Sequence, residues 1–234
     1  MGEFDPLGNQ DFQIAIDPNK PVILCDADEV IVYFVRPLEA YLAENGFSLD
    51  LSSYNLFGNI RHLSTNEVAH KELCIDLLKS FFDKRVDLCP PVDGAQKALK
   101  KLSQHAQIIV LSNVPFNARK GRERSLAANG MPFPVIANEG PKGPAVRTLL
   151  HNHKSKVFFI DDIASHHKSV AEHAGHVRRI HFVADPRLSK LLDNAEHAHA
   201  RLNHWNEIEN FILNHLQITP ENEHQARRNT PSST

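Results

Sequence analysis

The sequence Val22-Ile-Leu-Cys-Asp-Ala-Asp28 joins four apolar residues to two aspartates that are separated by one alanine. A turn-rich segment, Asp17-Pro-Asn-Lys-Pro21, precedes it. A continuous apolar run between turn residues and acids is typical of a parallel strand that is buried on both faces. We therefore predict a central strand over 22–25, with Asp26 and Asp28 just beyond its carboxyl end.

Further apolar runs follow, and helical patterns separate them. These runs predict strands at 108–111, 133–137, 157–160 and 180–183, with a last amphipathic helix near 205–216. Strands that alternate with helices in this way indicate an α/β fold. We expect a Rossmann-like, doubly wound parallel sheet of about five strands, with helices on both faces.

The segment from Ile31 to Cys89 differs in its sequence pattern, which is helical, and in its composition, which is rich in aromatic residues. Ser64-x-x-Glu67 has the spacing of a capping box and predicts a helix that runs to about Phe82. Residues 52–63 form a connection whose aromatic and basic residues suit a contact surface, and an ordinary packed helix connection explains them equally well.

The composition favours a small-molecule partner. Lys plus Arg total 26 and Asp plus Glu total 28 in 234 residues, so no basic field attracts a DNA or RNA polymer or an anionic membrane. Three widely spaced cysteines indicate neither a disulfide framework nor a zinc knuckle. No apolar run approaches the roughly 18 residues of a membrane span, and a signal-peptide pattern is missing from the first twenty residues. We expect a cytoplasmic protein and leave its oligomeric state open.

Three of the predicted strands end in polar residues: Asp26-Ala-Asp28, Ser112-Asn113 and Asp161-Asp162. In an open parallel sheet these ends meet at one edge, where ligands bind. Carboxylates gathered at one edge repel each other and require a cation. An all-oxygen site suits Mg²⁺ better than Zn²⁺.

Such a site suits phosphoryl chemistry. A carboxylate beside a metal can attack phosphorus, and a second carboxyl can give a proton to the leaving oxygen. The phosphoryl oxygens need donors, which Ser112, amides near Asn113 and a lysine would supply. Lys142 follows the third strand and so begins at the edge that holds the acids. Lys154 and Lys156 precede the fourth strand and begin at the opposite edge, so we choose Lys142.

Four features in this order resemble the haloacid dehalogenase-like (HAD) hydrolase superfamily, over about residues 21–185. They are the strand that ends in Asp26-Ala-Asp28, the strand that ends in Ser112, the lysine Lys142 and the strand that ends in Asp161-Asp162. The resemblance implies that Asp26 becomes the phosphoaspartate and Asp28 is the general acid and base. It implies that Ser112 and Lys142 bind the phosphoryl group. The implied magnesium ligands are Asp26, Asp28 through its backbone carbonyl, Asp161 and Asp162, of which Asp162 is the more direct of the acidic pair.

The resemblance also implies a domain division. Residues 21–33 and 90–217 would form the HAD-like α/β core, and 34–89 a helical cap inserted after the first motif. Residues 1–20 would be a flexible lead-in and 218–234 a disordered tail.

Two details bear on substrate choice. The superfamily often has glycine after the second aspartate, where this chain has Glu29, which would adopt a less favoured turn conformation or a different turn. Asp28-Glu-Val-Ile-Val-Tyr-Phe34 and Pro91-Val-Asp-Gly-Ala95 also resemble the 5'(3')-deoxyribonucleotidase group. In that case Phe34 would stack on a base; otherwise it packs the hinge of the cap.

The predicted function is magnesium-dependent hydrolysis of a small phosphomonoester, either a phosphorylated metabolite or a nucleotide. Phosphoryl transfer by a phosphotransferase or mutase of the same fold is one alternative. A HAD-like binding protein that keeps the metal site without catalysis is another. The fifteen histidines have no zinc-ligand spacing, although His166 and His167 follow the acidic pair closely enough for one to face the site.

Overall fold

The fold was analysed in a computed structural model, in which residues 14–218 are described. Within this range six strands form one parallel sheet. They are β1 (Val22–Cys25), β4 (Gln107–Ser112), β5 (Val135–Ala137), β6 (Val157–Asp161), β7 (Arg178–His181) and β8 (Ala200–Arg201). The predicted α/β class and parallel sheet are confirmed. The two-residue β8 was not predicted, because Ala-Arg carries no strand pattern.

The sheet has the order β5-β4-β1-β6-β7-β8, so β1 is central. The chain passes from β1 to one side through β4 and β5, and then returns to build β6, β7 and β8 on the other side. The strand order therefore reverses beside β1, and the crevice at such a point is where open α/β sheets bind ligands.

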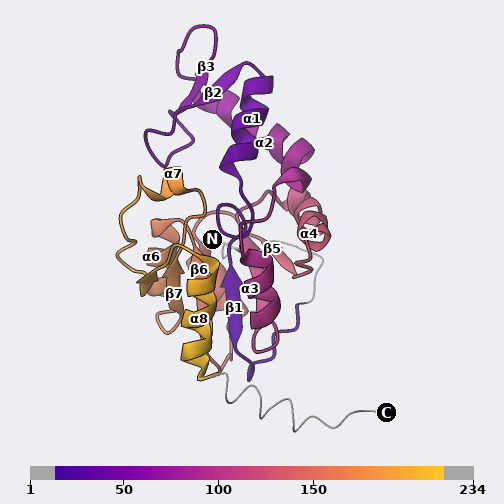
Figure 1. The fold of residues 1–234 in the computed structure, drawn as a ribbon, viewed down its shortest axis with the longest axis vertical. Helices are drawn as coiled ribbons and strands as arrows, with labels where there is room; N and C mark the ends of the chain where they lie inside the picture. The colour runs from indigo at the N-terminus through magenta and orange to yellow at the C-terminus, as the bar shows by residue number, and fades with distance from the viewer. Residues whose placement is uncertain (1–13, 219–234) are drawn as a thin grey trace, which may run out of the picture.

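Helices cover both faces of the sheet (Figure 1). Alternate strand residues enter two apolar clusters: Ile23 and Cys25 face α3 (Ala95–Leu102) and α8 (Trp205–Leu216), and Val22 and Leu24 face α5 (Lys142–Leu149) and α6 (Ala164–His173). The apolar side chains of β1 are completely buried. Each Å² of apolar surface that is removed from water stabilises the folded state by about 25 cal/mol, so this packing on both faces of the sheet is the main stabilising contribution.

Three further helices complete the core. They are η2 (Phe116–Ala118), α4 (Arg119–Ala128) and α7 (Pro186–Ser189). Residues 14–20, expected within a flexible lead-in, are held on the core: Ile14 and Ile16 pack against it, and the N–H of Asp17 donates to Gln107 Oε1 at 2.9 Å. The remainder of the expected lead-in, 1–13, and the tail from 219 onward lie outside the described residues.

The segment between β1 and α3 lies beyond the sheet, at the top of Figure 1. It contains α1 (Val35–Glu44), the antiparallel pair β2 (Phe47–Leu49) and β3 (Ile60–His62), α2 (Lys71–Arg85) and η1 (Val86–Leu88). We call residues 34–89 the inserted segment. The expected helical cap did not include the β2–β3 hairpin.

The predicted capping box is wrong. Helix α2 begins at Lys71 rather than near Ser64, and the His70 side chain accepts the hydrogen bond from the N–H of Leu73. The bridge between Arg61 and Val68 extends the hairpin through this region instead. Backbone pairing of β3 with residues 67–69 thus overrode a four-residue side-chain signal.

The chain enters and leaves the inserted segment at one place. Val32 bridges Pro91 in antiparallel fashion, the N–H of Tyr33 donates to Pro90 O at 2.8 Å, and the N–H of Val92 donates to Ile31 O at 3.0 Å. This short pair attaches the inserted segment to the core next to the end of β1.

None of the helices within residues 14–218 has the length and apolar character needed to span a bilayer.

Candidate active site

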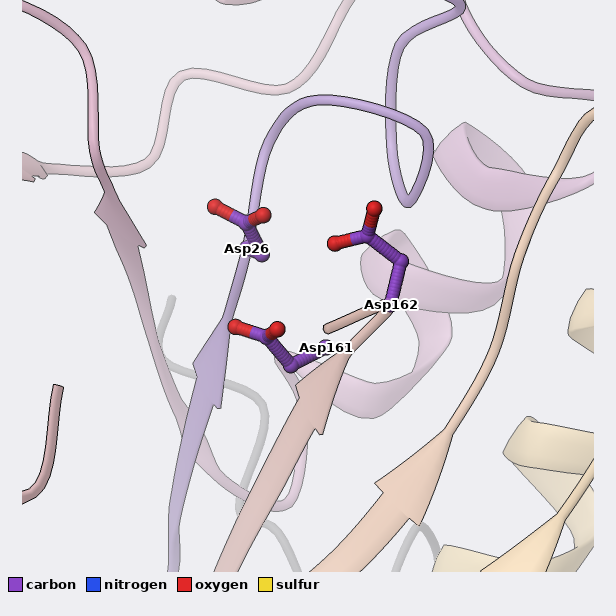
Figure 2. Close-up of side chains that lie close together, drawn as sticks. All are labelled: Asp26, Asp161 and Asp162. Carbon is purple, nitrogen blue, oxygen red and sulfur yellow. The ribbon is translucent and has the colours of Figure 1, made fainter. Parts of the chain in front are cut away.

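Three carboxylates converge at the carboxyl ends of β1 and β6 (Figure 2). The register pairs Cys25 with Ile160, which places Asp26 beside Asp161, and the N–H of Asp26 donates to Ile160 O at 2.9 Å. Asp162 follows at the first position after the strand. One oxygen of each carboxylate lies within 4.8 Å of the other two, and all three residues are buried.

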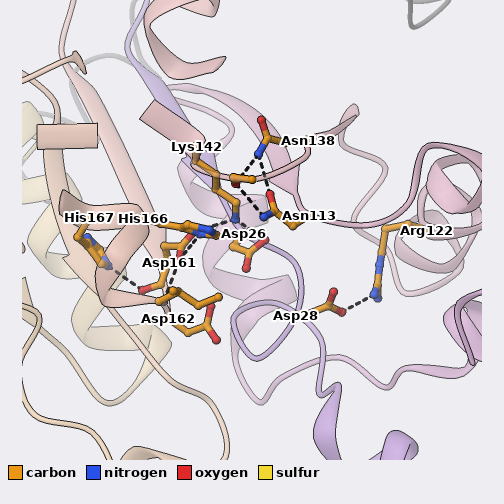
Figure 3. A network of polar contacts seen from close by, with 12 residues as sticks. Asp26, Asp28, Asn113, Arg122, Asn138, Lys142, Asp161, Asp162, His166 and His167 are labelled. Atoms are coloured by element: carbon orange, nitrogen blue, oxygen red, sulfur yellow. Dashed lines mark hydrogen bonds and ion pairs between the residues drawn. The ribbon is translucent and has the colours of Figure 1, made fainter. Parts of the chain in front are cut away.

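Lys142 lies between two of these acids (Figure 3). Its Nζ is 2.7 Å from Asp26 Oδ1 and 2.7 Å from Asp161 Oδ2, and the side chain is fully buried. Burial alone would lower the pKa of Lys142, but Asp161 and Asp26 outweigh it and raise that pKa. Lys142 is therefore a permanent cation in this site.

The position of Lys142 depends on a glycine. Lys142 is the first residue of α5, and the N–H of Gly143 donates to Ser169 Oγ on α6 at 3.0 Å. A Cβ at Gly143 would lie 2.2 Å from the backbone oxygen of Ser169. Only glycine lets the two helices approach this closely and bring the start of α5 to the end of β1.

Asp161 is held by several partners at once. Besides Lys142, the N–H of Ile163 donates to Oδ1 at 2.9 Å, and His166 Nδ1 lies 3.2 Å from the same oxygen. Burial acts to raise the pKa of Asp161, but Lys142 and His166 lower it well below its usual range. Asp161 is thus an ionised carboxylate whose role here is to fix its neighbours.

The pKa values of Asp26 and Asp162 are raised instead of lowered. Burial, opposed by Lys142 and reinforced by Asp161, raises the pKa of Asp26 to about 6. Burial, together with Asp161 and Asp26, raises the pKa of Asp162 well above its usual range. The site therefore has more negative charge than Lys142 alone offsets.

The donor set fits a hard divalent cation. Asp162 Oδ2 accepts a hydrogen bond from the hydroxyl of Tyr54, while Asp162 Oδ1 is buried and has no hydrogen-bond partner among residues 14–218. An unsatisfied buried carboxylate oxygen next to two further carboxylates matches the oxygen ligands that Mg²⁺ prefers.

Asp28 lies apart from this cluster and contacts an arginine (Figure 3). Its Oδ1 accepts a charge-assisted hydrogen bond from Arg122 Nη2 of α4. The Arg122 side chain is fully buried, whereas that of Asp28 is 21% exposed. Arg122 therefore fixes a carboxylate that still reaches the open side of the site.

Ser112 ends β4 on the other side of β1, and Asn113 follows it. Ser112 is buried, and its Oγ has no hydrogen-bond partner within the described part of the chain. Asn113 Nδ2 donates to Gly140 O at 3.0 Å, and Asn138 Nδ2 donates to Asn113 Oδ1 at 2.7 Å. This amide network fixes the loop that follows β4 next to the loop that leads to Lys142.

Glu29 adopts the turn conformation that usually needs glycine. Its φ is 57°, in the left-handed region, and its side chain is buried. Oε1 accepts hydrogen bonds from the N–H groups of Phe34 and Val35 at 2.9 and 2.8 Å, at the start of α1. Burial raises the pKa of Glu29, although these N–H groups act against the rise. Glu29 thus provides a group that glycine lacks, because its carboxylate caps the first helix of the inserted segment.

A cavity of about 300 Å³ opens onto Asp26, Asp28 and Asp162. Its remaining walls come mostly from apolar side chains of the inserted segment. Phe34 lines it, and the Phe34 ring stacks on Phe82 at 5.6 Å between centroids. The expected base-stacking residue therefore already has a protein ring on one face.

Two neighbouring histidines support the backbone of the acidic pair. His167 Nε2 is 3.0 Å from Asp161 O, and His181 Nε2 is 2.9 Å from Asp162 O. Within residues 14–218, Asp26, Asp161 and Asp162 are the only residues of the types His, Cys, Asp and Glu that cluster closely enough to hold a metal ion, so no histidine belongs to such a cluster there.

Solved structures share this architecture. A HAD family hydrolase from Deinococcus radiodurans with bound phosphate and sodium superimposes with a TM-score of 0.56 at 16% identity, over 87% of this chain and 99% of that one. A proposed HAD hydrolase from Bacillus subtilis bound to magnesium gives 0.60 at 11% identity, over 83% and 99%. The chain has the HAD hydrolase fold.

A third HAD-like hydrolase, from Streptococcus pneumoniae, gives a TM-score of 0.58 at 11% identity, over 83% of this chain and 99% of that one. No protein-family profile and no curated protein sequence matches this chain. The likeness to HAD hydrolases is therefore one of three-dimensional structure, with little sequence identity.

Within this HAD fold, sequence reasoning missed two residues of the site. The residue type gives no signal for Arg122, because an arginine on a polar-looking helix is usually solvated. Its spacing from Ala118, Ser125 and Leu126 places it on the buried face of α4, and that periodicity was the available signal. Tyr54 was noted only as part of a contact loop, and its contact with Asp162 depends on folding of the inserted segment over the sheet.

Proposed function

We propose that this protein is a magnesium-dependent phosphatase that hydrolyses a small phosphomonoester through an aspartyl-phosphate on Asp26. The observation that supports this most directly is the buried cluster in which Lys142 bridges Asp26 and Asp161 while Asp162 keeps an unpaired oxygen. The bound phosphate of the Deinococcus radiodurans relative and the magnesium of the Bacillus subtilis relative are consistent with this proposal.

The cation would be held by side-chain oxygens of Asp26 and Asp162 and by the backbone carbonyl of Asp28. When bound, it supplies positive charge that offsets the carboxylates and the phosphoryl oxygens. Asp161 holds Lys142 in place and is the less direct member of the acidic pair, because Lys142, His166 and the N–H of Ile163 already occupy its carboxylate.

The chemistry needs Asp26 ionised and Asp28 within reach of the leaving oxygen. At neutral pH, Asp26, with a pKa of about 6, is mainly a carboxylate. Its oxygen forms a bond to phosphorus while the phosphorus–oxygen bond to the alcohol breaks, and Asp28, which must carry a proton at the start of this step, gives that proton to the departing oxygen. Water then attacks phosphorus, Asp28 accepts a proton from it, and the bond to Asp26 breaks to release inorganic phosphate.

Ser112 and Lys142 are suited to bind the phosphoryl oxygens. The unpartnered Ser112 Oγ can donate a hydrogen bond, and the Lys142 ammonium group supplies charge. Asn113, fixed by Asn138, lines the cavity and would contact substrate there.

We infer that the inserted segment, residues 34–89, acts as a cap on a core of residues 21–33 and 90–217. The antiparallel pair at Val32 and Pro91 gives it one attachment, and Tyr54 reaches from it to Asp162. A lid in this position excludes water from the phosphoryl group and selects the alcohol part of the substrate.

Phosphate release from p-nitrophenyl phosphate tests the proposal. We expect turnover with Mg²⁺, loss of turnover in EDTA, and a fall of at least about a thousandfold in Asp26→Asn. Asp76→Asn, which changes an exposed carboxylate on α2, is the control and should keep full activity. Equal turnover by Asp26→Asn and the unmodified protein would refute the mechanism.

The same assay separates the alternatives. Transfer of the phosphoryl group to an added sugar phosphate, at the expense of phosphate release, would indicate a phosphotransferase. Binding of Mg²⁺ without turnover of any of a broad set of phosphate esters would indicate a binding protein.

A further inference from the structure

The walls of the cavity differ sharply in chemistry. Its polar groups come mainly from the core: Asp26, Asp28 and Asp162, with Asn113. The inserted segment contributes mostly apolar side chains: Phe34, Val35, Leu49, Leu51, Leu56, Leu78 and Phe82. The part of a ligand that extends from the acids therefore meets hydrocarbon.

Positively charged side chains are missing from this wall. Among the described residues that line the cavity there is no Lys, Arg or His, and Glu29 adds a further acid. The nearby Lys79 lines a different cavity, which shares only Asn113 with this one. A second phosphate or a carboxylate on the substrate would enter a site of its own charge without a partner, at a high cost in free energy.

Three polar side chains of the inserted segment line the cavity, Ser53, Tyr54 and Asn55, and the first two already have partners. Ser53 Oγ accepts a hydrogen bond from Asn59 Nδ2 at 2.8 Å, and the Tyr54 hydroxyl donates to Asp162. The hydroxyl groups of a sugar would lose water here and find few new partners, which disfavours them.

The size and shape suit one ring. An apolar cavity of about 150 Å³ is enough for benzene, so about 300 Å³ holds a single ring together with a phosphoryl group. The Phe34 and Phe82 rings stack with an interplanar angle of 23° and give the wall a flat aromatic element.

We propose that the substrate is the phosphate monoester of a small, uncharged, apolar alcohol, either aromatic or branched, and that the apolar wall of the inserted segment is its specificity determinant. This class rests on the proposed phosphatase function. It excludes sugar bisphosphates and disfavours nucleotides, whose ribose and base carry polar groups that this wall does not satisfy.

Benzyl phosphate, glycerol 3-phosphate and glucose 6-phosphate test the proposal, because all three are esters of primary alcohols. We expect kcat/KM for benzyl phosphate to exceed the other two by about 10- to 100-fold, as expected from burial of one ring. Deoxynucleoside monophosphates should have values of kcat/KM as low as those of the sugar phosphates. A sugar phosphate or nucleotide turned over as well as benzyl phosphate would overturn the proposal.

Introduction of a positive charge into the wall sharpens the test. Leu56→Lys should lower kcat/KM for benzyl phosphate about tenfold or more and raise it for fructose 1,6-bisphosphate. Phe57→Lys is the matched control, because Phe57 is the next residue, is 48% exposed and does not line the cavity. Thermal melting of both variants checks that they fold. Equal effects of the two lysines would count against the wall as the specificity determinant.

Binding separates this inference from the proposed function. Calorimetry with benzylphosphonate and with a glycerol phosphonate analogue reports the preference of the cavity without turnover. Tighter binding of benzylphosphonate with no hydrolysis of any ester would keep the apolar specificity and refute the phosphatase. Hydrolysis with no preference in either assay would keep the phosphatase and refute the apolar specificity.

Discussion

The carboxylate of Glu29 accepts a hydrogen bond from the backbone N–H of Asp185, 3.0 Å away and 156 positions later in the chain. The backbone of Glu29 is bonded to the same loop, since the N–H of Ala184 donates to Glu29 O at 2.8 Å. Its other carboxylate oxygen caps α1 through Phe34 and Val35. One buried residue thus joins the turn after β1, the inserted segment and the loop before α7.

Replacement of Glu29 by glycine tests this junction. Glycine relieves the left-handed φ of 57°, which favours the variant by about 1 kcal/mol. It also leaves three N–H groups without their acceptor, at about 1–3 kcal/mol each where they stay buried. We expect Glu29→Gly to lower the free energy of unfolding by at least about 2 kcal/mol in urea titrations.

Asn66→Gly is the control for backbone conformation. Asn66 has a φ of 60° and an exposed side chain. Its replacement should change stability by no more than about 0.5 kcal/mol in either direction. If both variants are as stable as the unmodified protein, Glu29 does not hold the junction.

The sequence was sufficient for the features that depend on local patterns. Apolar runs that end in acids predicted β1 and β6, and the edge rule for parallel sheets predicted that Asp26 and Asp161 would meet. The hairpin β2–β3 and the contact between Tyr54 and Asp162 could not be predicted in this way. Both depend on pairing and packing between segments whose local signals, such as Ser64-x-x-Glu67, indicate something else.

Glu29 shows the same limit at a single position. The sequence identified it as a departure from glycine and predicted an unusual turn. It could not show that the carboxylate would find donors at Phe34 and at Asp185, because the second donor lies far along the chain.

The ion pair between Arg122 and Asp28 predicts an energetic coupling. We expect a double-mutant cycle with Arg122→Met and Asp28→Asn to give a coupling of about 1–3 kcal/mol in urea unfolding, because Arg122 is fully buried and the 21% exposure of Asp28 weakens the pair only in part. The exposed pair Arg124–Asp87, which involves the same helix, is the matched control and should couple by less than about 0.5 kcal/mol. Equal coupling in the two cycles would show that burial of Arg122 adds nothing to the coupling energy of its ion pair.

The contact of Tyr54 with Asp162 predicts tighter cation binding when it is removed. The Tyr54 hydroxyl occupies Asp162 Oδ2, and a hydrogen bond to a charged group contributes about 1.5–3 kcal/mol. Tyr54→Phe should therefore bind Mg²⁺ about 10- to 100-fold more tightly by isothermal titration calorimetry. Tyr41→Phe alters a buried tyrosine that packs on Phe81, and it should leave the affinity unchanged. Unchanged affinity in Tyr54→Phe would mean that the hydroxyl does not compete with the cation.

Asp185 predicts how stability depends on acid. Burial acts to raise its pKa, but hydrogen bonds from Arg187 and Arg36 lower the pKa to about 2. Arg187 also bonds Glu39 of α1 at 2.7 Å, so this cluster fastens the inserted segment to the core. Because the pKa is lower in the folded protein than the value of about 3.9 for a free side chain, the stabilisation is complete above about pH 4 and is lost between about pH 4 and pH 2.

Asp185→Asn should therefore lower the free energy of unfolding near pH 6 by about 1–2 kcal/mol, a figure reduced by the partial exposure of both arginines. The difference from the unmodified protein should shrink as the pH falls from about 4 to 2, measured by urea unfolding at each pH. Asp76→Asn, on the exposed face of α2, should follow the unmodified protein throughout. A difference that stayed constant down to pH 2 would mean that the ionised form of Asp185 is not what fastens the inserted segment.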